Sequence, residues 1–544
     1  MLHWLRHYQR SMLPGDISAG ILVAMMMVPQ GMAYALVAGL PPVVGLYASI
    51  IPPLLYALFG SSMTQSVGPM AITSLMTAAA LSAIPNVGPG LYMVLAAQLA
   101  LLSGGVLLLC GLLRIGFLAN FFSRPVMSGF TIGAALLIAY GQVAPMLGGA
   151  PDAIHPPSAM LGLGSLAVLL LARQYLAALL QRVGMRASVA DTAARLAPMF
   201  VVVGATVLAA TFDLAGAGVQ VTGEVPSGLP SLNLATSARH WPALVQPALL
   251  MGFVIFLVSM SAAQTLALRR QEKLQSNYEL VGLGMANIGS ALTGGYPVAG
   301  SISRSAVNFN AGANTPLASI ITAALLAVAL VAPTGWLALL PLPTLAATII
   351  VAVMSMLELS TLRTAWRYDR GDALALLATL AGVLVLGIEA GVVLGVLLSM
   401  GNLIWRASRP HVAVLGRIAG SEHFRNIERH QAQTMPNVLM LRIDANLFFG
   451  NVEAVNARIE EELKALPDTN HLVLVMTAVS SIDTSALFGL EDLNLALKQR
   501  GIGLHLAEVK GPVMDRLLCS DLVGKLNGKV FLSAALAAAT LKAP

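Results

Sequence analysis

The stretch YPVAGSISRSAVN, from Tyr296 to Asn308, places an arginine between apolar runs long enough to cross a bilayer. Arg304 is the only basic residue of the chain that does not fall near a predicted membrane surface. An arginine at the centre of a membrane helix costs about 2.5–3.5 kcal/mol on insertion scales, so it normally faces protein or water and marks an ion path. Glycines and a proline disfavour helix before Ser301, and the pattern is helical after it. We therefore expect a helix that begins inside the membrane, with free N–H groups that attract anions beside a cation.

The composition is that of a polytopic membrane protein. Of the 544 residues, 57% are hydrophobic and 10% are charged, whereas soluble domains carry about 25% charged residues. The net charge of +6 does not indicate nucleic-acid binding, because the basic residues form short clusters between apolar runs. Cys110 and Cys519 form neither a disulfide framework nor a metal-ligand spacing. The sequence has no paired carboxylates, nucleophile–base arrangement or phosphate-binding loop, so we expect no enzyme, no metal and no cofactor.

About fourteen apolar segments follow one another, at roughly 20 residues per crossing. The third and the tenth segments are the least regular. The first seven predicted segments are Ile17–Ala38, Pro42–Phe59, Ser66–Ile84, Leu91–Leu113, Pro125–Met146, Ala159–Leu180 and Leu196–Phe212. The second seven are Leu244–Leu268, Tyr278–Thr293, Ser301–Ala311, Pro316–Val331, Leu337–Leu357, Ala373–Gly387 and Ile388–Trp405.

The basic clusters predict the orientation of these spans. With the N-terminus inside, the connections on one side carry nearly all the basic residues, while Arg239 and the acids Asp152, Asp213 and Glu224 lie on the other side. This is the positive-inside pattern, which predicts a multi-pass protein of the inner (plasma) membrane with both termini in the cytoplasm. The clustered basic residues are Arg114, Arg124, Arg173, Arg182, Arg186, Arg195, Arg269, Arg270, Lys273, Arg363, Arg367 and Arg370.

Seven spans followed by seven would leave the halves oppositely oriented, and the irregular segments then occupy matching places. Such a match is the best sequence indication of a transporter's binding site. The first irregular segment contains SSMTQSVGPMAITS, residues 61–74, where Gly68 would let the backbone turn and Pro69 suits the first helical turn. A helix from Pro69 to Ile84 would be about 24 Å long, shorter than a hydrocarbon core of about 30 Å.

The composition changes after Trp405, and we place the domain boundary between residues 409 and 410. Residues 1–409 form the predicted transmembrane domain, and residues 410–544 a predicted small α/β domain. Its expected strands are Asn437–Ile443, His471–Met476 and Gly503–Ala507. Its expected helices are Val452–Leu466, Ala486–Lys498 and Pro512–Leu518.

Several long motifs resemble those of the sulfate permease (SulP) family, which includes the animal solute carrier 26 transporters. The motifs are PPVVGLYASIIPPLLYALFGSSMTQSVGPMA (Pro41–Ala71), VPQGMAYA (Val28–Ala35), GGYPVAGSISRSAVN (Gly294–Asn308) and GIEAGVVLGVLLS (Gly387–Ser399). VSSIDTSALFGLEDL (Val479–Leu493) resembles part of a STAS domain, the module that follows the membrane part in this family.

This resemblance implies a 7+7 inverted repeat with a core domain (spans 1–4 and 8–11) and a gate domain (spans 5–7 and 12–14). The core would move against the gate in a homodimer embedded in lipid, and a small anion would bind between the starts of the third and tenth spans. Family substrates include sulfate, bicarbonate, chloride and C4-dicarboxylates. The substrate-binding residues expected here are Gln30, Tyr34, Gly68, Pro69, Met70, Ala71, Ser301, Ile302, Ser303 and Arg304.

Each of these residues also has a structural interpretation. Arg304 would brace the fold if it paired with a carboxylate, although an intramembrane charge beside a helix start favours an anion site. Gln30 and Tyr34 share a helix face next to Pro29, an expected break, and such polar groups face either a cavity or another helix. Met70 is either a wall of the pocket or a core methionine.

The chain departs from the family at Val258, where many members carry an acidic residue that is a candidate for coupling to a proton or a sodium ion. The eighth span contains no carboxylate, so coupling at this position is not expected, and the coupling ion stays open. Gln264 is a candidate for lining the same cavity. The remaining acids near span ends, Asp16, Glu358 and Glu389, are interpreted as structural.

Ser485 stands where some STAS proteins are phosphorylated. Phosphate at a helix start is electrostatically favourable, so a regulatory role is one hypothesis. The simpler interpretation is that Asp483, Thr484 and Ser485 precede a helix and cap it.

The sequence thus predicts a secondary-active transporter of small anions, with sulfate or a related inorganic anion as the expected substrate. A bicarbonate or C4-dicarboxylate carrier of the same family and a passive anion channel are the alternatives. A nucleobase permease would need carboxylates in the eighth and tenth spans, where this chain has Val258 and Arg304. A STAS protein with a silent membrane part is the remaining alternative.

Overall fold

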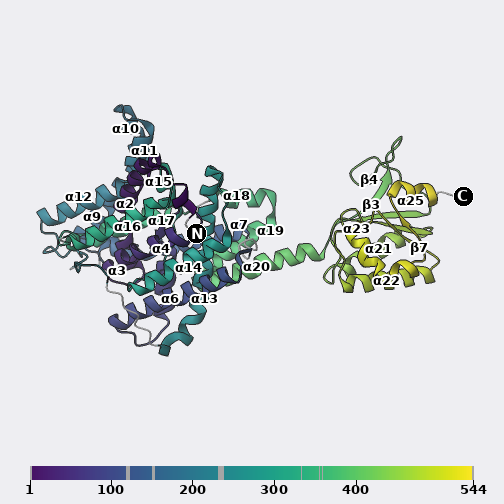
Figure 1. The fold of residues 1–544 in the computed structure, drawn as a ribbon, viewed down its shortest axis with the longest axis horizontal. Coiled ribbons are helices and arrows are strands. Elements are labelled where there is room, and N and C mark those ends of the chain that lie inside the picture. The colour runs from purple at the N-terminus through teal and green to yellow at the C-terminus, as the bar shows by residue number, and fades with distance from the viewer. Residues whose placement is uncertain are drawn as a thin grey trace. The chain divides into compact units, whose positions relative to one another are not determined.

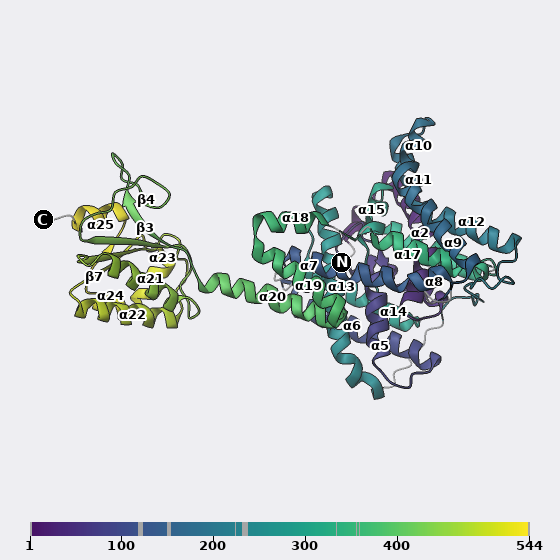
Figure 2. The ribbon, with the colours of Figure 1, turned by 180° about the vertical axis from the view of Figure 1, so that it is seen from behind.

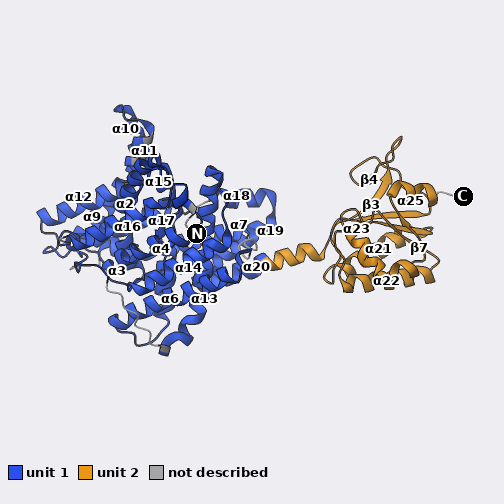
Figure 3. Cartoon of the chain, viewed as in Figure 1, with its two compact units in different colours: residues 1–399 blue, residues 400–544 orange. Residues whose placement is uncertain are grey.

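The computed structural model describes residues 3–117, 123–149, 154–223, 225–230, 238–332, 334–354, 356–357 and 359–541. Asp152, Glu224 and Glu358 lie outside the described residues. The chain divides into two compact units, Met1–Ser399 and Met400–Pro544 (Figure 3). The division falls inside helix α20 (Ile388–Ser408), which ends one residue before the predicted domain boundary.

The described residues of unit 1 form helices, with one short pair of strands among them. The helices of its first half are α1 (His3–Arg6), α2 (Leu13–Val37), α3 (Pro42–Tyr47), α4 (Ile51–Phe59), α5 (Ala71–Ser82), α6 (Pro89–Leu112), α7 (Arg124–Gly141), α8 (Val143–Leu147), α9 (Pro156–Leu171), α10 (Ala177–Arg182), α11 (Ala187–Arg195) and α12 (Ala197–Thr211). The helices of its second half are α13 (Trp241–Arg270), α14 (Ser276–Leu292), α15 (Ile302–Asn310), α16 (Leu317–Val331), α17 (Leu342–Met354), α18 (Leu359–Tyr368) and α19 (Arg370–Leu386), followed by α20.

Every predicted span coincides with a helix or a pair of helices, but the helices differ in length. Within the described residues, 8 helices are long and apolar enough to cross a membrane, or 9 if one bent pair counts as a single span. Helices α5 and α16 are shorter and apolar, and α15 is both short and polar. The count of fourteen spans therefore stays a prediction. The expected break at Pro29 is wrong, because α2 continues through this residue from Leu13 to Val37.

Glycines let neighbouring helices of unit 1 approach closely. A Cβ at Gly104 of α6 would lie 2.8 Å from the Gly284 carbonyl oxygen of α14, and a Cβ at Gly284 would lie 2.7 Å from the Leu108 amide nitrogen. Small residues at such crossings are how membrane helices gain packing contacts without a hydrophobic driving force. Figures 1 and 2 show α6, α13 and α14 side by side in both views.

A buried carboxylate anchors the start of α2 to the connection between α15 and α16. Asp16 Oδ1 accepts hydrogen bonds from the Asn314 amide at 2.7 Å and the Thr315 amide at 3.0 Å. Its Oδ2 accepts from the Thr315 hydroxyl at 2.6 Å. Because these donors satisfy both oxygens, Asp16 has the structural role that we expected of it.

Unit 2 contains a six-stranded sheet in the order β4-β3-β5-β6-β7-β8. Strands β5 to β8 are parallel, and the predicted strands correspond to β5, β6 and β7. The bounds are β3 (Val412–Arg417), β4 (Phe424–Asn426), β5 (Val438–Ile443), β6 (His471–Val475), β7 (Gly503–Ala507), β8 (Val530–Phe531), α21 (Val452–Ala465), α22 (Thr484–Gln499), α23 (Gly511–Leu518), α24 (Leu522–Lys525) and α25 (Ala534–Leu541).

The two faces of this sheet carry separate apolar cores. Side chains of α21 and α22 pack on one face of β5 with Leu439 and Leu441, whereas α25 packs on the opposite face with Val438 and Met440. Alternate residues of β5 thus point to opposite cores, as the two-residue period of a strand requires. Figure 1 shows α25 on the other side of the sheet from α21 and α22.

Candidate functional site

A two-residue strand pair brings the two irregular segments together. Strand β1 (Val67–Gly68) pairs antiparallel with β2 (Ala299–Gly300), with Val67 opposite Gly300 and Gly68 opposite Ala299. Helix α5 begins shortly after β1, and α15 begins shortly after β2. The N-terminal ends of both helices therefore lie close to the strand pair.

The start of α5 differs from the prediction. Pro69 is not in the first helical turn, because the chain stays extended through Met70 and the helix begins at Ala71. Gly68 is part of β1 and does not form a turn. The pairing with β2 holds residues 67–68 extended, and the helix also ends at Ser82 and not at Ile84, so its 12 residues are about 18 Å long and not about 24 Å.

Arg304 lies in the first turn of α15 and is 1% exposed. Its Nη1 donates to the Pro69 carbonyl oxygen at 2.7 Å. Its Nε and Nη2 are buried and have no partner among the described residues. No carboxylate there lies within ion-pair distance of Arg304, so the ion pair that would make it a structural brace is not present in the described part of the chain. Two buried N–H donors of a cation therefore need an acceptor.

The first turns of both helices add further donors. Ser301 caps α15, and its Oγ accepts from the Arg304 amide at 3.5 Å and lies 3.2 Å from the Ser303 Oγ. Met70 precedes α5 without any side-chain cap. The first N–H groups of a helix have no acceptor within it, and both ends carry the positive pole of the helix dipole. Ser303 and Ile302 are exposed, with 48% exposure for Ile302, so the start of α15 is open on one side.

Helix α2 packs against both α5 and α15 and contributes the remaining predicted residues. Tyr34 is 8% exposed, and Gln30 is half-buried with its Oε1 buried and without a partner among the described residues. Met70 is buried and belongs to the same large core cluster as Tyr34. A Cβ at Gly68 would meet the Met27 methyl group and would lie 3.5 Å from Arg304 Nη2. Because Gly68 has no side chain, the Met27 methyl group can pack against this backbone close to the unpaired edge of the guanidinium.

The two candidates on α13 have different positions. Val258 is buried, whereas Gln264 is exposed and is not brought to the site. The next residue, Ser259, was not predicted, yet its Oγ accepts from the Gly300 amide at 2.9 Å. Gln65, also not predicted, donates from Nε2 to the Ser259 carbonyl oxygen at 3.0 Å. Their sequence signal is that Gln65 is a polar residue just before the apolar segment Ser66–Ile84 and Ser259 is a polar residue within the segment Leu244–Leu268.

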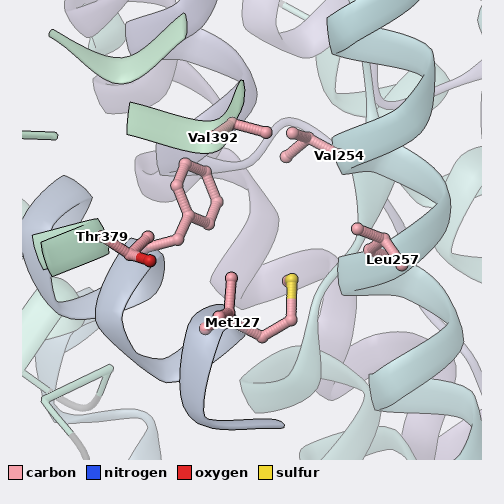
Figure 4. Close-up of a pocket in the computed structure, with 7 residues that line it drawn as sticks. Met127, Val254, Leu257, Thr379 and Val392 are labelled. Carbon is pink, nitrogen blue, oxygen red and sulfur yellow. The ribbon is translucent and has the colours of Figure 1, made fainter. Parts of the chain in front are cut away.

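Figure 4 shows a small cavity where α13 faces α7, α19 and α20. Its volume is ≈ 10 Å³, about the minimum for one water molecule, which would also need two or more polar partners. Thr379 is the one polar lining residue, and its hydroxyl already donates to the Ala375 carbonyl oxygen at 2.7 Å. The lining residues are Val126, Met127, Phe130, Val254, Leu257, Thr379 and Val392. This contact is apolar and offers no anion site.

In unit 2, Ser485 is exposed in the first turn of α22. The cap of this helix is Asp483, whose Oδ1 accepts from the Ala486 amide at 2.8 Å and whose Oδ2 accepts from the Phe449 amide at 2.9 Å. This geometry agrees with the capping interpretation of Asp483. Phosphorylation of Ser485 stays a prediction.

Comparison with known proteins identifies relatives along almost the whole chain. The pattern of the sulfate permease family matches residues 13–379, and that of the STAS domain matches residues 429–537. A "Probable sulfate transporter" of Mycobacterium tuberculosis (strain ATCC 25618 / H37Rv) is 36% identical over 541 residues, which cover 96% of this chain and 94% of that protein. "Sulfate transporter 4.1, chloroplastic" of Arabidopsis thaliana is 34% identical, covering 97% of this chain and 79% of that protein.

Solved structures share the fold. The murine solute carrier 26 family member A9 anion transporter has a TM-score of 0.89 at 22% identity, covering 99% of this chain and 94% of that chain. The transmembrane domain of a cyanobacterial bicarbonate transporter has a TM-score of 0.61 at 22% identity, covering 71% of this chain and 98% of that chain. The predicted helical transporter fold with a C-terminal STAS domain is thereby confirmed.

Proposed function

This chain belongs to the sulfate permease family, and from this premise we propose that it carries sulfate across the membrane by alternating access. One observation supports the proposal above all others. Arg304 is buried between the starts of two helices, and two of its donors have no partner among the described residues. A tetrahedral oxyanion supplies several acceptor oxygens, which are what such a guanidinium edge lacks.

The charges at the site suit a dianion. Each helix start contributes about +0.5 and Arg304 contributes one full charge, which gives about +2 near the strand pair. No acidic side chain of the described residues lies within ion-pair distance of Arg304 to offset this charge. The substrate site that we propose consists of Gln30, Tyr34, Gly68, Pro69, Met70, Ala71, Ser301, Ile302, Ser303 and Arg304.

The proposed orientation follows from charge. We place the basic connections, both termini and the STAS domain in the cytoplasm, with the membrane unit in the inner membrane as part of a homodimer. The apolar contact of α13 with α7, α19 and α20 (Figure 4) is where the core would slide against the gate. Such a contact carries no hydrogen bonds that would have to break during the movement.

Uptake into proteoliposomes tests this function. Purified protein should accumulate labelled sulfate, and the rate should saturate with sulfate concentration, because each cycle needs a conformational change. Unlabelled bicarbonate and fumarate should compete less well than sulfate. Preferred uptake of either competitor would assign the chain to the bicarbonate or dicarboxylate carriers, and single-channel currents in planar bilayers would contradict the carrier mechanism.

Removal of residues 410–544 is expected to weaken dimer formation or delivery to the membrane and to leave the order of anion preference unchanged. The reason is that every proposed substrate contact lies in unit 1. Size-exclusion chromatography with light scattering measures the assembly, and competition assays measure the preference. A changed order of preference in the truncated protein would contradict this separation of roles.

A further inference from the structure

Glu279 is a fully buried carboxyl group near the start of α14, outside the proposed anion site. Its Oε1 accepts from the Ser61 amide at 3.0 Å, the Ser62 amide at 2.9 Å and the Ser61 hydroxyl at 2.6 Å. Its Oε2 lies 2.7 Å from the Tyr56 hydroxyl oxygen. The donors thus gather on one oxygen, and the other oxygen has only Tyr56 as a partner among the described residues.

Tyr56 stands between two acceptors. Its hydroxyl oxygen also lies 2.8 Å from Gln65 Oε1. Gln65 Nε2 donates to the Ser259 carbonyl oxygen, which fixes the orientation of the amide, because a flipped amide would place two oxygens together. A phenol has one hydrogen to donate, so it cannot serve Glu279 and Gln65 at the same time.

One additional proton satisfies this network. A neutral Glu279 donates from Oε2 to Tyr56, and Tyr56 donates to Gln65, so that each acceptor receives a hydrogen. An ionised Glu279 takes the Tyr56 hydrogen and leaves the buried Gln65 oxygen without a donor, which is unfavourable. We propose that Glu279 is a proton-binding site and that its proton sets the direction of the hydrogen bonds reaching β2.

The network ends on the strand that positions the anion site. A Cβ on Gly300 would overlap the Gln65 amide nitrogen, and the Gly300 amide donates to the Ser259 hydroxyl at 2.9 Å. Gln65 and Ser259 therefore hold β2 immediately before Ser301, the cap of α15. This inference rests on the proposed function and adds a way of regulating it. When Glu279 loses its proton, Gln65 loses the hydrogen bond from Tyr56, β2 is held less firmly and anion transport slows.

Glu279 lies close to solvent through its hydrogen-bond partner Ser61. Ser61 is half-buried, and its Oγ accepts from the amide of exposed Gln275 at 3.3 Å, so the carboxyl group lies one side chain from solvent. Exposed Gln275 is two residues from Lys273, which belongs to a connection that we assign to the cytoplasmic side.

No cation of the described residues lies within ion-pair distance of Glu279. Arg270 pairs with Glu272 at 2.7 Å and donates to two carbonyl oxygens of the connection after α15. The titratable and charged groups on α14, on the helices packed against it and on the adjoining connection are Tyr56, Tyr92, Cys110, Arg269, Arg270, Glu272, Lys273 and Tyr278.

Infrared spectroscopy of the purified full-length protein tests the proton directly. At neutral pH, where ordinary carboxyl groups are ionised, we expect the carbonyl stretch of a protonated carboxylic acid in the wild type and not in Glu279→Gln; in the wild type it should disappear as the pH rises further. Asp16→Asn is the matched control. Asp16 is also buried, but its donors can all bond to an ionised carboxylate without leaving another acceptor unpaired. This variant should therefore keep the band. No such band in the wild type at neutral pH, or an equal band in Glu279→Gln at the same pH, would overturn the proposal.

Transport provides the second measurement. Wild-type sulfate uptake should fall as the pH on the cytoplasmic side rises, because the stabilising proton is lost. Glu279→Gln should keep the acid-side rate across the range, since its amide always donates to Tyr56. Parallel pH profiles of the two proteins would overturn the link to β2. If the wild type transports no sulfate at any pH, the proposed function fails, while the infrared band still decides whether Glu279 binds a proton.

Discussion

Arg304→Ala is expected to lower the affinity for sulfate by about 100-fold or more, because a hydrogen bond to a charged group contributes about 1.5–3 kcal/mol and two are lost. The variant should still fold. A buried guanidinium without a carboxylate partner is costly to keep, so its removal offsets the lost packing and the lost bond to Pro69. Equilibrium binding of labelled sulfate and thermal unfolding of the purified protein measure the two effects.

Two further variants sharpen this test. Arg304→Lys keeps the charge but loses the planar pair of donors, so its affinity should fall between those of the wild type and of Arg304→Ala. Arg270→Ala removes a guanidinium that donates to the carbonyl oxygens of Ala313 and Asn314, away from the anion site, and should leave sulfate affinity unchanged. Unaltered sulfate binding by a well-folded Arg304→Ala protein would remove Arg304 from the site.

Gly300→Ala is expected to abolish most sulfate uptake and to destabilise the protein by about 1–3 kcal/mol, the usual cost of overpacking a core. The added methyl group would overlap the Gln65 amide nitrogen and lie 2.7 Å from its Cδ. Gln65 is 2% exposed and is held by Ser259 and Tyr56, so it cannot move aside without breaking these hydrogen bonds. Displacement of β2 would then shift the start of α15.

A double variant separates this steric cause from others. Gln65→Ala creates the space that the methyl group needs, so Gln65→Ala with Gly300→Ala should be more stable than the sum of the two single effects predicts. Gly105→Ala is the control, because a Cβ at this position of α6 meets no atom within 4 Å. Additive destabilisation by the two single changes would show that Gly300 is not restricted by Gln65.

The sequence predicted the start of α15 and not the start of α5, for a physical reason. Glycines and a proline before Ser301 act locally, so they predict a helix boundary directly. Pro69 also favours a first helical turn locally, but pairing with β2, which is remote in the chain, keeps residues 67–70 extended. A long-range contact of this kind leaves no periodic signal in the sequence.

Glu279 is the second residue of the predicted span Tyr278–Thr293, and the sequence does not distinguish a buried acid there from a solvated one at the membrane surface. An acid in the first turns of a helix is normally solvated and stabilised by the helix dipole. Its burial depends on α4 and on the segment before β1, which supply Tyr56 and Ser61. Asp16 stands in the same kind of place, just before the predicted span Ile17–Ala38, and its structural interpretation agrees with its buried hydrogen bonds.

A structure of the protein with bound selenate tests the central claim most directly, since selenium identifies a sulfate-like anion by its anomalous scattering. We predict one selenate between the starts of α5 and α15, with oxygens within hydrogen-bond distance of Arg304 Nε and Nη2. Selenate bound elsewhere in the membrane unit, with the Arg304 guanidinium directed away from it, would contradict the account.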